Sequence, residues 1–262
     1  MNERCSGIRR NSISKLLIRS TAFLVLAMPA LMGCSGGQVS DEGIAKSDFH
    51  YRLARNYYND HNIAMAQREV HEALTLNPEH PKALLLRGFI QMGLKQLDEA
   101  AASFRAALKV KPDFFEARNN LGAVMMAQGL YAEAIRILEP LTHEPLYVTP
   151  WFAHGNLGRC YYELGDLEKA RTYLEMAVFL NPRYCLGYLH LGIVHQDRGD
   201  LRDARSTFEK AIKNCPKFAE PYYHLGVIQQ RAGEMEAARA SFAKCVELAP
   251  ETAVGKRCAI RQ

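Results

Sequence analysis

The stretch LGRCYYELGDLEKARTYLEMAVFLNP, residues 157–182, contains three positions that recur through most of this 262-residue chain. They are occupied here by Gly158, Ala170 and Pro182. Their counterparts are Gly88, Gly122, Gly192 and Gly226; Ala66, Ala100, Ala134, Ala204 and Ala238; and Pro78, Pro112, Pro216 and Pro250. The spacing is 34 residues, apart from one step of 36 in which a proline is missing. A fixed period of this length indicates stacked units that cannot bury their apolar faces alone.

This pattern resembles the tetratricopeptide repeat, a helix–turn–helix unit of 34 residues. The resemblance implies an all-α fold, a right-handed superhelical solenoid whose first helices line a concave groove. It places six units at residues 47–80, 81–114, 115–148, 151–184, 185–218 and 219–252, and leaves residues 253–262 as a short C-terminal tail.

The recurring glycines need a packing reason, because glycine inside a helix costs about 1 kcal/mol relative to alanine. We expect the glycine at unit position 8, such as Gly158, to approach the alanine at position 20, here Ala170. Each recurring proline ends the second helix of its unit, because proline cannot continue a helix.

The 36-residue step falls in THEPLYVTPW, residues 142–151, which contains Pro145 and Pro150. These prolines predict that the second helix of the third unit ends early and that a bend or bulge follows. The insertion is either a functional landmark or a tolerated lengthening of a loop.

Residues 1–33 carry +4 of the formal net charge of +5 and end in an apolar segment, residues 21–33. Thirteen residues are too few for a permanent membrane span but suit a signal peptide. The sequence Leu31-Met32-Gly33-Cys34 resembles the bacterial lipobox, which implies a lipid on the Cys34 thiol. Ser35 then favours the outer membrane, and residues 34–46 form a flexible tether. The alternative is an ordinary secretory signal that contains a cysteine.

The remaining chain has a net charge of only +1, which does not indicate a nucleic-acid partner. The sequence contains no HExxH, GxGxxG, Walker or G-x-S-x-G motif, so it predicts no metal, no cofactor and no enzymatic activity. A site assembled from Arg55, Glu116 and Arg159 is the enzymatic alternative.

Apolar side chains at the groove positions of the first helices indicate binding of an apolar peptide or amphipathic helix from a partner protein. The alternative is that several of them pack against the neighbouring first helix. The candidate groove residues are Tyr51, Tyr58, Leu85, Phe89, Met92, Met126, Phe152, Tyr162, Leu189, Ile193, Tyr223 and Val227.

Export would place the cysteines after Cys34 in a compartment where disulfides persist. Cys185 and Cys215 hold positions 1 and 31 of the fifth unit, where the start of one helix lies beside the end of the other, so they are the first candidate pair. Cys245 and Cys258 are the second candidate pair, and Cys160 is left over. The ten residues after Thr252 include Gly255, so we do not expect a full capping helix.

A lipobox, a short tether and six repeats together resemble the pilotin lipoproteins of type IV pilus systems, the PilF/PilW and Tgl type. Residues 138–157 look like the inter-repeat break of that family. The resemblance implies an outer-membrane lipoprotein with its repeats in the periplasm, which binds secretin subunits and promotes their assembly. The alternative is a general periplasmic adaptor for cell-envelope assembly.

Overall fold

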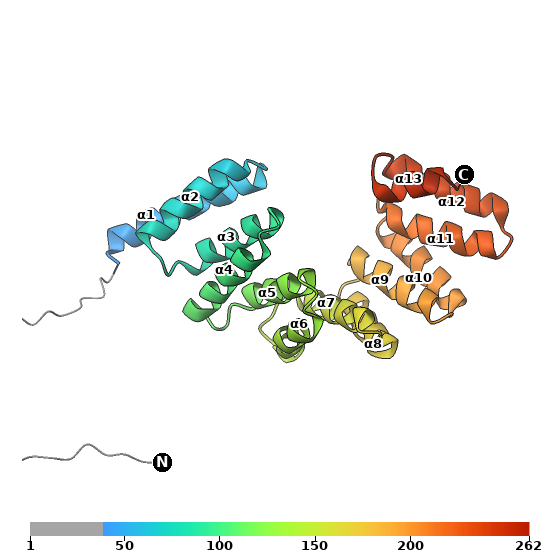
Figure 1. Ribbon diagram of the computed structural model, residues 1–262, viewed down its shortest axis with the longest axis horizontal. Coiled ribbons are helices and arrows are strands. Elements are labelled where there is room, and N and C mark those ends of the chain that lie inside the picture. Colours follow the sequence, from blue (N-terminus) through green and yellow to red (C-terminus); the bar gives the residue numbers. More distant parts are fainter. Residues whose placement is uncertain (1–38, 262) are drawn as a thin grey trace, which may run out of the picture. The chain divides into compact units, whose positions relative to one another are not determined.

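The computed structural model describes residues 39–261, and these residues contain α-helices, turns and no strand (Figure 1). This confirms the all-α expectation. No described helix is both long enough and apolar enough to cross a membrane. The predicted signal peptide and Cys34 lie outside the described residues. The helices are α1 (Asp41–Asn59), α2 (Ile63–Leu76), α3 (Pro81–Gly93), α4 (Leu97–Val110), α5 (Phe115–Ala127), α6 (Tyr131–Leu138), the 3-10 helix η1 (Glu139–His143), α7 (Pro150–Glu163), α8 (Leu167–Leu180), α9 (Cys185–Asp197), α10 (Leu201–Asn214), α11 (Ala219–Arg231), α12 (Met235–Leu248) and α13 (Ala253–Ala259).

Helices α1 to α12 form six consecutive hairpins, and each hairpin packs on the next (Figure 1). We call the odd-numbered members the first helices and the even-numbered members the second helices. In each turn between the two helices of a hairpin, one residue has a positive φ. These residues recur with the period of the repeat. Four turns use glycine there, whereas the first two use His61 and Lys95, with φ of 58° and 61°. Non-glycine residues rarely adopt this conformation, so these two turns are locally strained.

The recurring glycines lie closest to a different side chain from the one expected. A Cβ added at Gly226 would lie 2.7 Å from the ring of Phe242, which occupies unit position 24. At Gly158 the nearest side chain is Leu174, again at position 24, and only the backbone carbonyl of Ala170 is close. At Gly158 the expected approach to position 20 is therefore made through the Ala170 carbonyl oxygen, at 3.1 Å, while the closest side chain is the one at position 24. The glycine makes room for the large side chain one turn further along the second helix.

The first helix begins six residues before the predicted first unit. Residues 41–46 were expected to belong to the tether, but α1 starts at Asp41. The Ser40 hydroxyl accepts a hydrogen bond from the Gly43 N–H, and Asp41 and Glu42 lie in the first turn. A capping serine followed by acidic residues stabilises a helix N-terminus, and this outweighs the small polar composition that suggested a tether.

The insertion between the third and fourth hairpins shortens a helix, as predicted. Helix α6 has 8 residues whereas the other second helices have 14 each, and the chain continues as η1 before α7 begins. The segment after η1 folds back onto the third hairpin: Tyr147 is buried, and its ring centroid lies 6.2 Å from that of Phe115. The insertion is therefore packed against the repeats.

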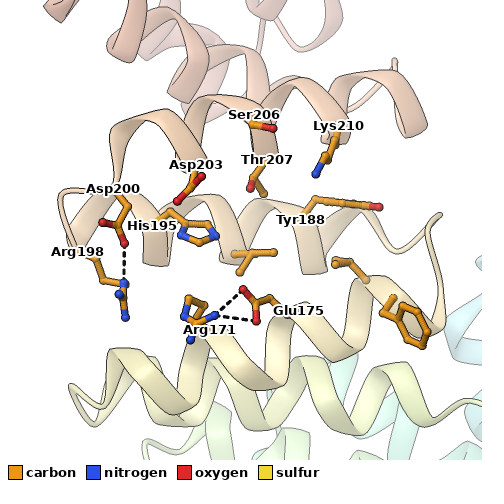
Figure 2. Close-up of a pocket in the computed structure, with 13 residues that line it drawn as sticks. Arg171, Glu175, Tyr188, His195, Arg198, Asp200, Asp203, Ser206, Thr207 and Lys210 are labelled. Carbon is orange, nitrogen blue, oxygen red and sulfur yellow. Dashed lines mark hydrogen bonds and ion pairs between the residues drawn. The ribbon is translucent and has the colours of Figure 1, made fainter.

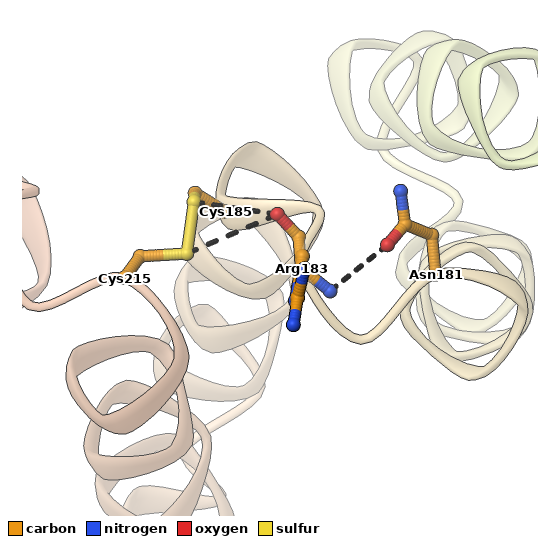
Figure 3. The surroundings of a disulfide bond; sticks show 4 residues. All are labelled: Asn181, Arg183, Cys185 and Cys215. Carbon is orange, nitrogen blue, oxygen red and sulfur yellow. Dashed lines mark hydrogen bonds between the residues drawn. A yellow bond between two sulfur atoms is a disulfide. The ribbon is translucent and has the colours of Figure 1, made fainter.

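Two disulfides lie in the last two hairpins. Cys185, the first residue of α9, is bonded to Cys215, which follows α10 (Figure 3). Cys245 of α12 is bonded to Cys258 of α13. These are the two pairs considered from the sequence. Cys160 is a buried thiol without a disulfide partner among residues 39–261.

Residues 253–259 form a short helix of 7 residues, half the length of α12, so the tail is helical although it is not a full capping helix. Thr252 caps α13 by accepting a hydrogen bond from the Gly255 N–H, and Val254 and Cys258 are buried against α11 and α12. Gly255 permits this helix, because a Cβ there would collide with the Ala249 carbonyl. The glycine that argued against a helix is the residue that lets it pack.

Candidate protein-binding groove

The candidate groove residues occupy the first helices, but they differ in exposure. Leu85, Met126 and Leu189 are buried and belong to the packed interior. They therefore support the groove wall and are not open to a partner. Phe152 is 42% exposed. The remaining candidates are half-buried: Tyr51, Tyr58, Phe89, Met92, Tyr162, Ile193, Tyr223 and Val227.

A pocket of about 690 Å³ lies where the insertion meets the first helices α3, α5 and α7. We call it the insertion pocket. Its apolar wall includes Phe89, Phe115 and Phe152, and the insertion adds Leu146 and Val148, whose exposed fractions are 74% and 83%. Large apolar side chains exposed beside aromatic rings are typical of protein-interaction sites.

Sequence reasoning selected two members of this pocket, Phe89 and Phe152, and missed the other three. Phe115 was missed because it is the first residue of the third unit, which is not one of the positions taken to line the groove. Leu146 and Val148 were missed because they lie in a loop, outside the helical positions that define the groove. The signal was present as the apolar run Leu146-Tyr147-Val148 between two prolines.

Polar groups at one edge of the insertion pocket give it a mixed charge. Lys111 and Asp113 lie in the turn before α5, and Glu116 and Asn119 lie on α5 itself. Burial raises the pKa of Glu116. The Asn119 Oδ1 atom accepts a hydrogen bond of 3.2 Å from the Asn156 amide on α7, which joins two neighbouring first helices. This edge provides hydrogen-bonding groups beside an apolar surface.

Further along the first helices, the Tyr162 hydroxyl donates a hydrogen bond of 2.6 Å to the Asp197 carboxylate. This bond, together with partial burial, raises the pKa of Tyr162 to about 12. Tyr162 belongs to α7 and Asp197 to α9, so the bond joins the fourth and fifth hairpins. One candidate groove residue is thereby fixed in position by its neighbour.

A second pocket, of about 560 Å³, lies on α8, α9 and α10, away from the insertion (Figure 2). Its charges are largely paired internally: Arg171 binds Glu175 with contacts of 2.7 and 2.9 Å, and Arg198 contacts Asp200 at 2.8 Å. His195 is buried, and its Nδ1 atom has no hydrogen-bond partner within residues 39–261. Each of these two pairs lies within one hairpin, whereas Arg198 also pairs with Glu168 of α8, and that contact joins the fourth and fifth hairpins.

The residues considered for an enzymatic site lie on three different helices, Arg55 on α1, Glu116 on α5 and Arg159 on α7. The insertion pocket includes Glu116 but neither arginine. Arg55 instead lies over the ring of Tyr51, with 5.9 Å from its Cζ atom to the ring centroid. Within the described part of the chain, no cluster of three His, Cys, Asp or Glu side chains could hold a metal ion.

The helical hairpins, their period and the aromatic groove define a repeat scaffold of the kind that binds other proteins. Models of the tetratricopeptide repeat match residues 51–102, 91–145, 151–184 and 189–252. The chain belongs to the tetratricopeptide repeat proteins. Its fold is therefore a solenoid of repeats, a scaffold that is typically non-catalytic and that mediates protein–protein interaction.

Among solved structures, the chain is similar to PilW, described as a widely conserved type IV pilus biogenesis factor. The two are 26% identical with a TM-score of 0.73, and the match covers 81% of this chain and 98% of PilW. PilF of Pseudomonas aeruginosa shares the fold, with 17% identity, a TM-score of 0.72, and coverage of 84% of this chain and all of PilF.

Two further proteins are similar to part of this chain. MamA is 27% identical with a TM-score of 0.53, and the match covers 63% of this chain and 95% of MamA. The CTR9 homolog of Arabidopsis thaliana is 30% identical over 143 residues, which are 53% of this chain. The chain covers only 13% of that plant protein's length, so this likeness concerns the repeats.

Proposed function

We propose that this protein acts in type IV pilus biogenesis by binding secretin subunits in its groove and promoting their assembly at the outer membrane. The observation that carries the proposal is the likeness to the pilus biogenesis factor PilW, which extends over 98% of that protein. The lipobox resemblance adds an acyl chain on Cys34, with the repeats facing the periplasm. A lipid anchor would concentrate the groove at the membrane where the ring forms.

The insertion pocket is the part of the groove best suited to hold an apolar segment of a secretin monomer. Leu146 and Val148 are largely exposed, beside the exposed ring of Phe152. Burying a leucine or valine side chain contributes about 1.5–3 kcal/mol. The captured segment would be kept from misassembly until neighbouring secretin subunits compete for it.

The proposal is tested by deleting the gene and blotting for heat-resistant secretin multimers. We expect the multimers to be lost and to be restored by the wild-type protein. A double variant, Leu146→Asp with Val148→Asp, should fail to restore them, because it places two carboxylates in the insertion pocket.

The matched control is Phe179→Asp, which changes an equally exposed apolar residue on the second helix α8. It should restore the multimers. Both sets of changes lie at exposed positions, so circular dichroism should show unchanged folding. Normal multimer levels in the deletion strain would reject the proposed function.

The anchor is tested separately with Cys34→Ser, which should move the protein from the membrane fraction to the soluble fraction. The alternative function, a general periplasmic adaptor for cell-envelope assembly, rests on the repeat fold, which specifies a binding scaffold and not a particular partner. Co-purification with a cell-wall hydrolase or synthase in place of a secretin would support that alternative.

A further inference from the structure

The helix α13 occupies the place of a first helix in a seventh repeat. It begins at Ala253, 34 residues after α11 begins at Ala219. It packs on α11 and α12, just as α11 packs on α9 and α10. The disulfide between Cys245 and Cys258 holds it there. The row of first helices therefore continues past the six predicted units (Figure 1).

The repeat register places two arginines of α13 at groove positions. Arg257 holds unit position 5 and Arg261 holds position 9, where the sixth hairpin has Tyr223 and Val227. The structure agrees with this register. The Cζ atom of Arg257 lies 4.5 Å from the centroid of the Tyr223 ring, and that of Arg261 lies 6.0 Å from it. Arg261 also donates a hydrogen bond of 2.9 Å to the Gln230 side chain on α11.

The guanidinium groups of α13 lack an acidic partner in the part of the chain that the structure describes. Within residues 39–261, no carboxylate forms an ion pair with Arg257, Arg261 or the neighbouring Arg231 of α11. Arg205 of α10, by contrast, pairs with Glu234. Near α13 the groove therefore carries three arginines without an ion pair in the described part of the chain, and two of them lie over the Tyr223 ring.

The insertion pocket, whose charge is mixed, has one more acidic than basic residue in its lining. Asp113 and Glu116 line that pocket beside a single cation, Lys111. A carboxylate on a bound polypeptide would be repelled there and attracted at α13, where arginine can bind it with two parallel hydrogen bonds. The insertion pocket, in the middle of the row of first helices, and the α13 end of the groove thus differ in the sign of charge that they favour.

We infer that the groove binds its polypeptide in one orientation, with acidic residues at the end nearest α13 and apolar residues toward the insertion pocket. This inference rests on the proposed function, since it describes the segment held by the same groove. It adds a requirement that an apolar groove alone does not impose: the bound segment carries carboxylates at one end only.

Three synthetic peptides of 18 residues serve as probes. All have leucine at helical spacing, and they differ in one terminal turn, which contains three Glu in one peptide, three Gln in the second and three Lys in the third. Fluorescence anisotropy measures their binding to the full chain at two salt concentrations. We expect the Glu peptide to bind about tenfold more tightly than the Gln peptide and the Lys peptide to bind most weakly. The differences should shrink in high salt.

The variant Arg257→Gln with Arg261→Gln should remove the preference, so that the Glu and Gln peptides bind with equal affinity. Arg239→Gln is the matched control, because Arg239 lies on the second helix α12 and pairs with Glu236. It should retain the preference. A photo-crosslinker at the acidic end should label α11 or α13, and not α3 or α5.

The outcomes separate the two ideas. Equal binding of the Glu and Gln peptides, or a preference that survives the double arginine substitution, overturns the inference and leaves the proposed groove intact. If no peptide binds and Leu146→Asp with Val148→Asp has no effect on secretin multimers, the proposed function fails and the inference fails with it.

Discussion

Replacing Gly88 by alanine should destabilise the protein, although alanine is the better helix former. Gly88 lies in α3, and a Cβ there would have three ring carbons of Phe104 within 2.8 Å. Ordinary carbon contacts are near 3.5–4.0 Å, so the ring must move by about 1 Å. Phe104 is fully buried and has no solvent to move into.

The magnitude follows from two opposing effects. Overpacking a well-packed interior costs about 1–3 kcal/mol, and the buried ring places this site near the upper value. Alanine in place of glycine recovers about 1 kcal/mol of helix propensity. The net expectation is a loss of about 2 kcal/mol, or roughly 30-fold in the local folding equilibrium.

A matched control lies in the same helix. Gly93 is exposed, its φ is not positive, and an added Cβ would meet nothing within 4 Å. Gly93→Ala should therefore stabilise the protein by about 0.4–1 kcal/mol. The same chemical change, five residues apart, should thus have opposite signs.

Urea unfolding followed by circular dichroism should shift to lower urea for Gly88→Ala and slightly higher urea for Gly93→Ala. Since repeat arrays do not always unfold in one step, hydrogen exchange of α3 and α4 amides should measure the local free energy as well. A Gly88→Ala protein as stable as the wild type would refute the argument that this glycine exists to admit the Phe104 ring.

Replacing Cys185 and Cys215 together by serine should lower the free energy of unfolding by about 3–4 kcal/mol, because the disulfide closes a loop with a sequence separation of 30. Urea titration of the wild-type protein and the double variant measures this difference. Burial and nearby positive charge lower the pKa of His190 and His224 to about 4. The unfolded chain takes up these protons near pH 6.5, so the free energy of unfolding should fall as the pH drops from about 6.5 to 4. The loss should be on the order of 2–3 kcal/mol for each imidazole. Glutamine at both positions should flatten this pH dependence in urea titrations. Burial raises the pKa of the Cys160 thiol to about 11, so iodoacetamide should modify it only after the protein unfolds. Mass spectrometry detects the modification, and rapid modification of the native protein would contradict the buried position.

The sequence allowed the repeats to be predicted because their signals are local. Glycine, alanine and proline at a fixed spacing identify each hairpin, and the two prolines of the insertion predicted where a helix would shorten. The side chain that comes closest to each glycine, at unit position 24, was not assigned, because the nearest contact depends on how far one helix is rotated against the other. Side-chain packing determines that rotation, and the spacing of the recurring residues does not predict it.

The ends of the helical array were predicted less well. Residues 41–46 were misread because their helix depends on one cap at Ser40, and α13 was missed because Gly255 was taken as a helix breaker. The insertion pocket depends on contacts between residues far apart in the sequence, such as Tyr147 with Phe115. Such contacts follow from the folded arrangement and not from the residue pattern.

The two disulfides are distributed unevenly along the solenoid, so its two ends should differ in their resistance to unfolding. Within residues 39–261, hairpins one to four are held by noncovalent packing, with two strained turns near the start, whereas one disulfide closes hairpin five and the other joins α12 of hairpin six to α13. In a linear array each unit is stabilised by its neighbours, so we expect thermal unfolding to begin at the α1 end and to reach the disulfide-linked hairpins last. The unpaired arginines of α13 lie in the part that stays ordered the longest.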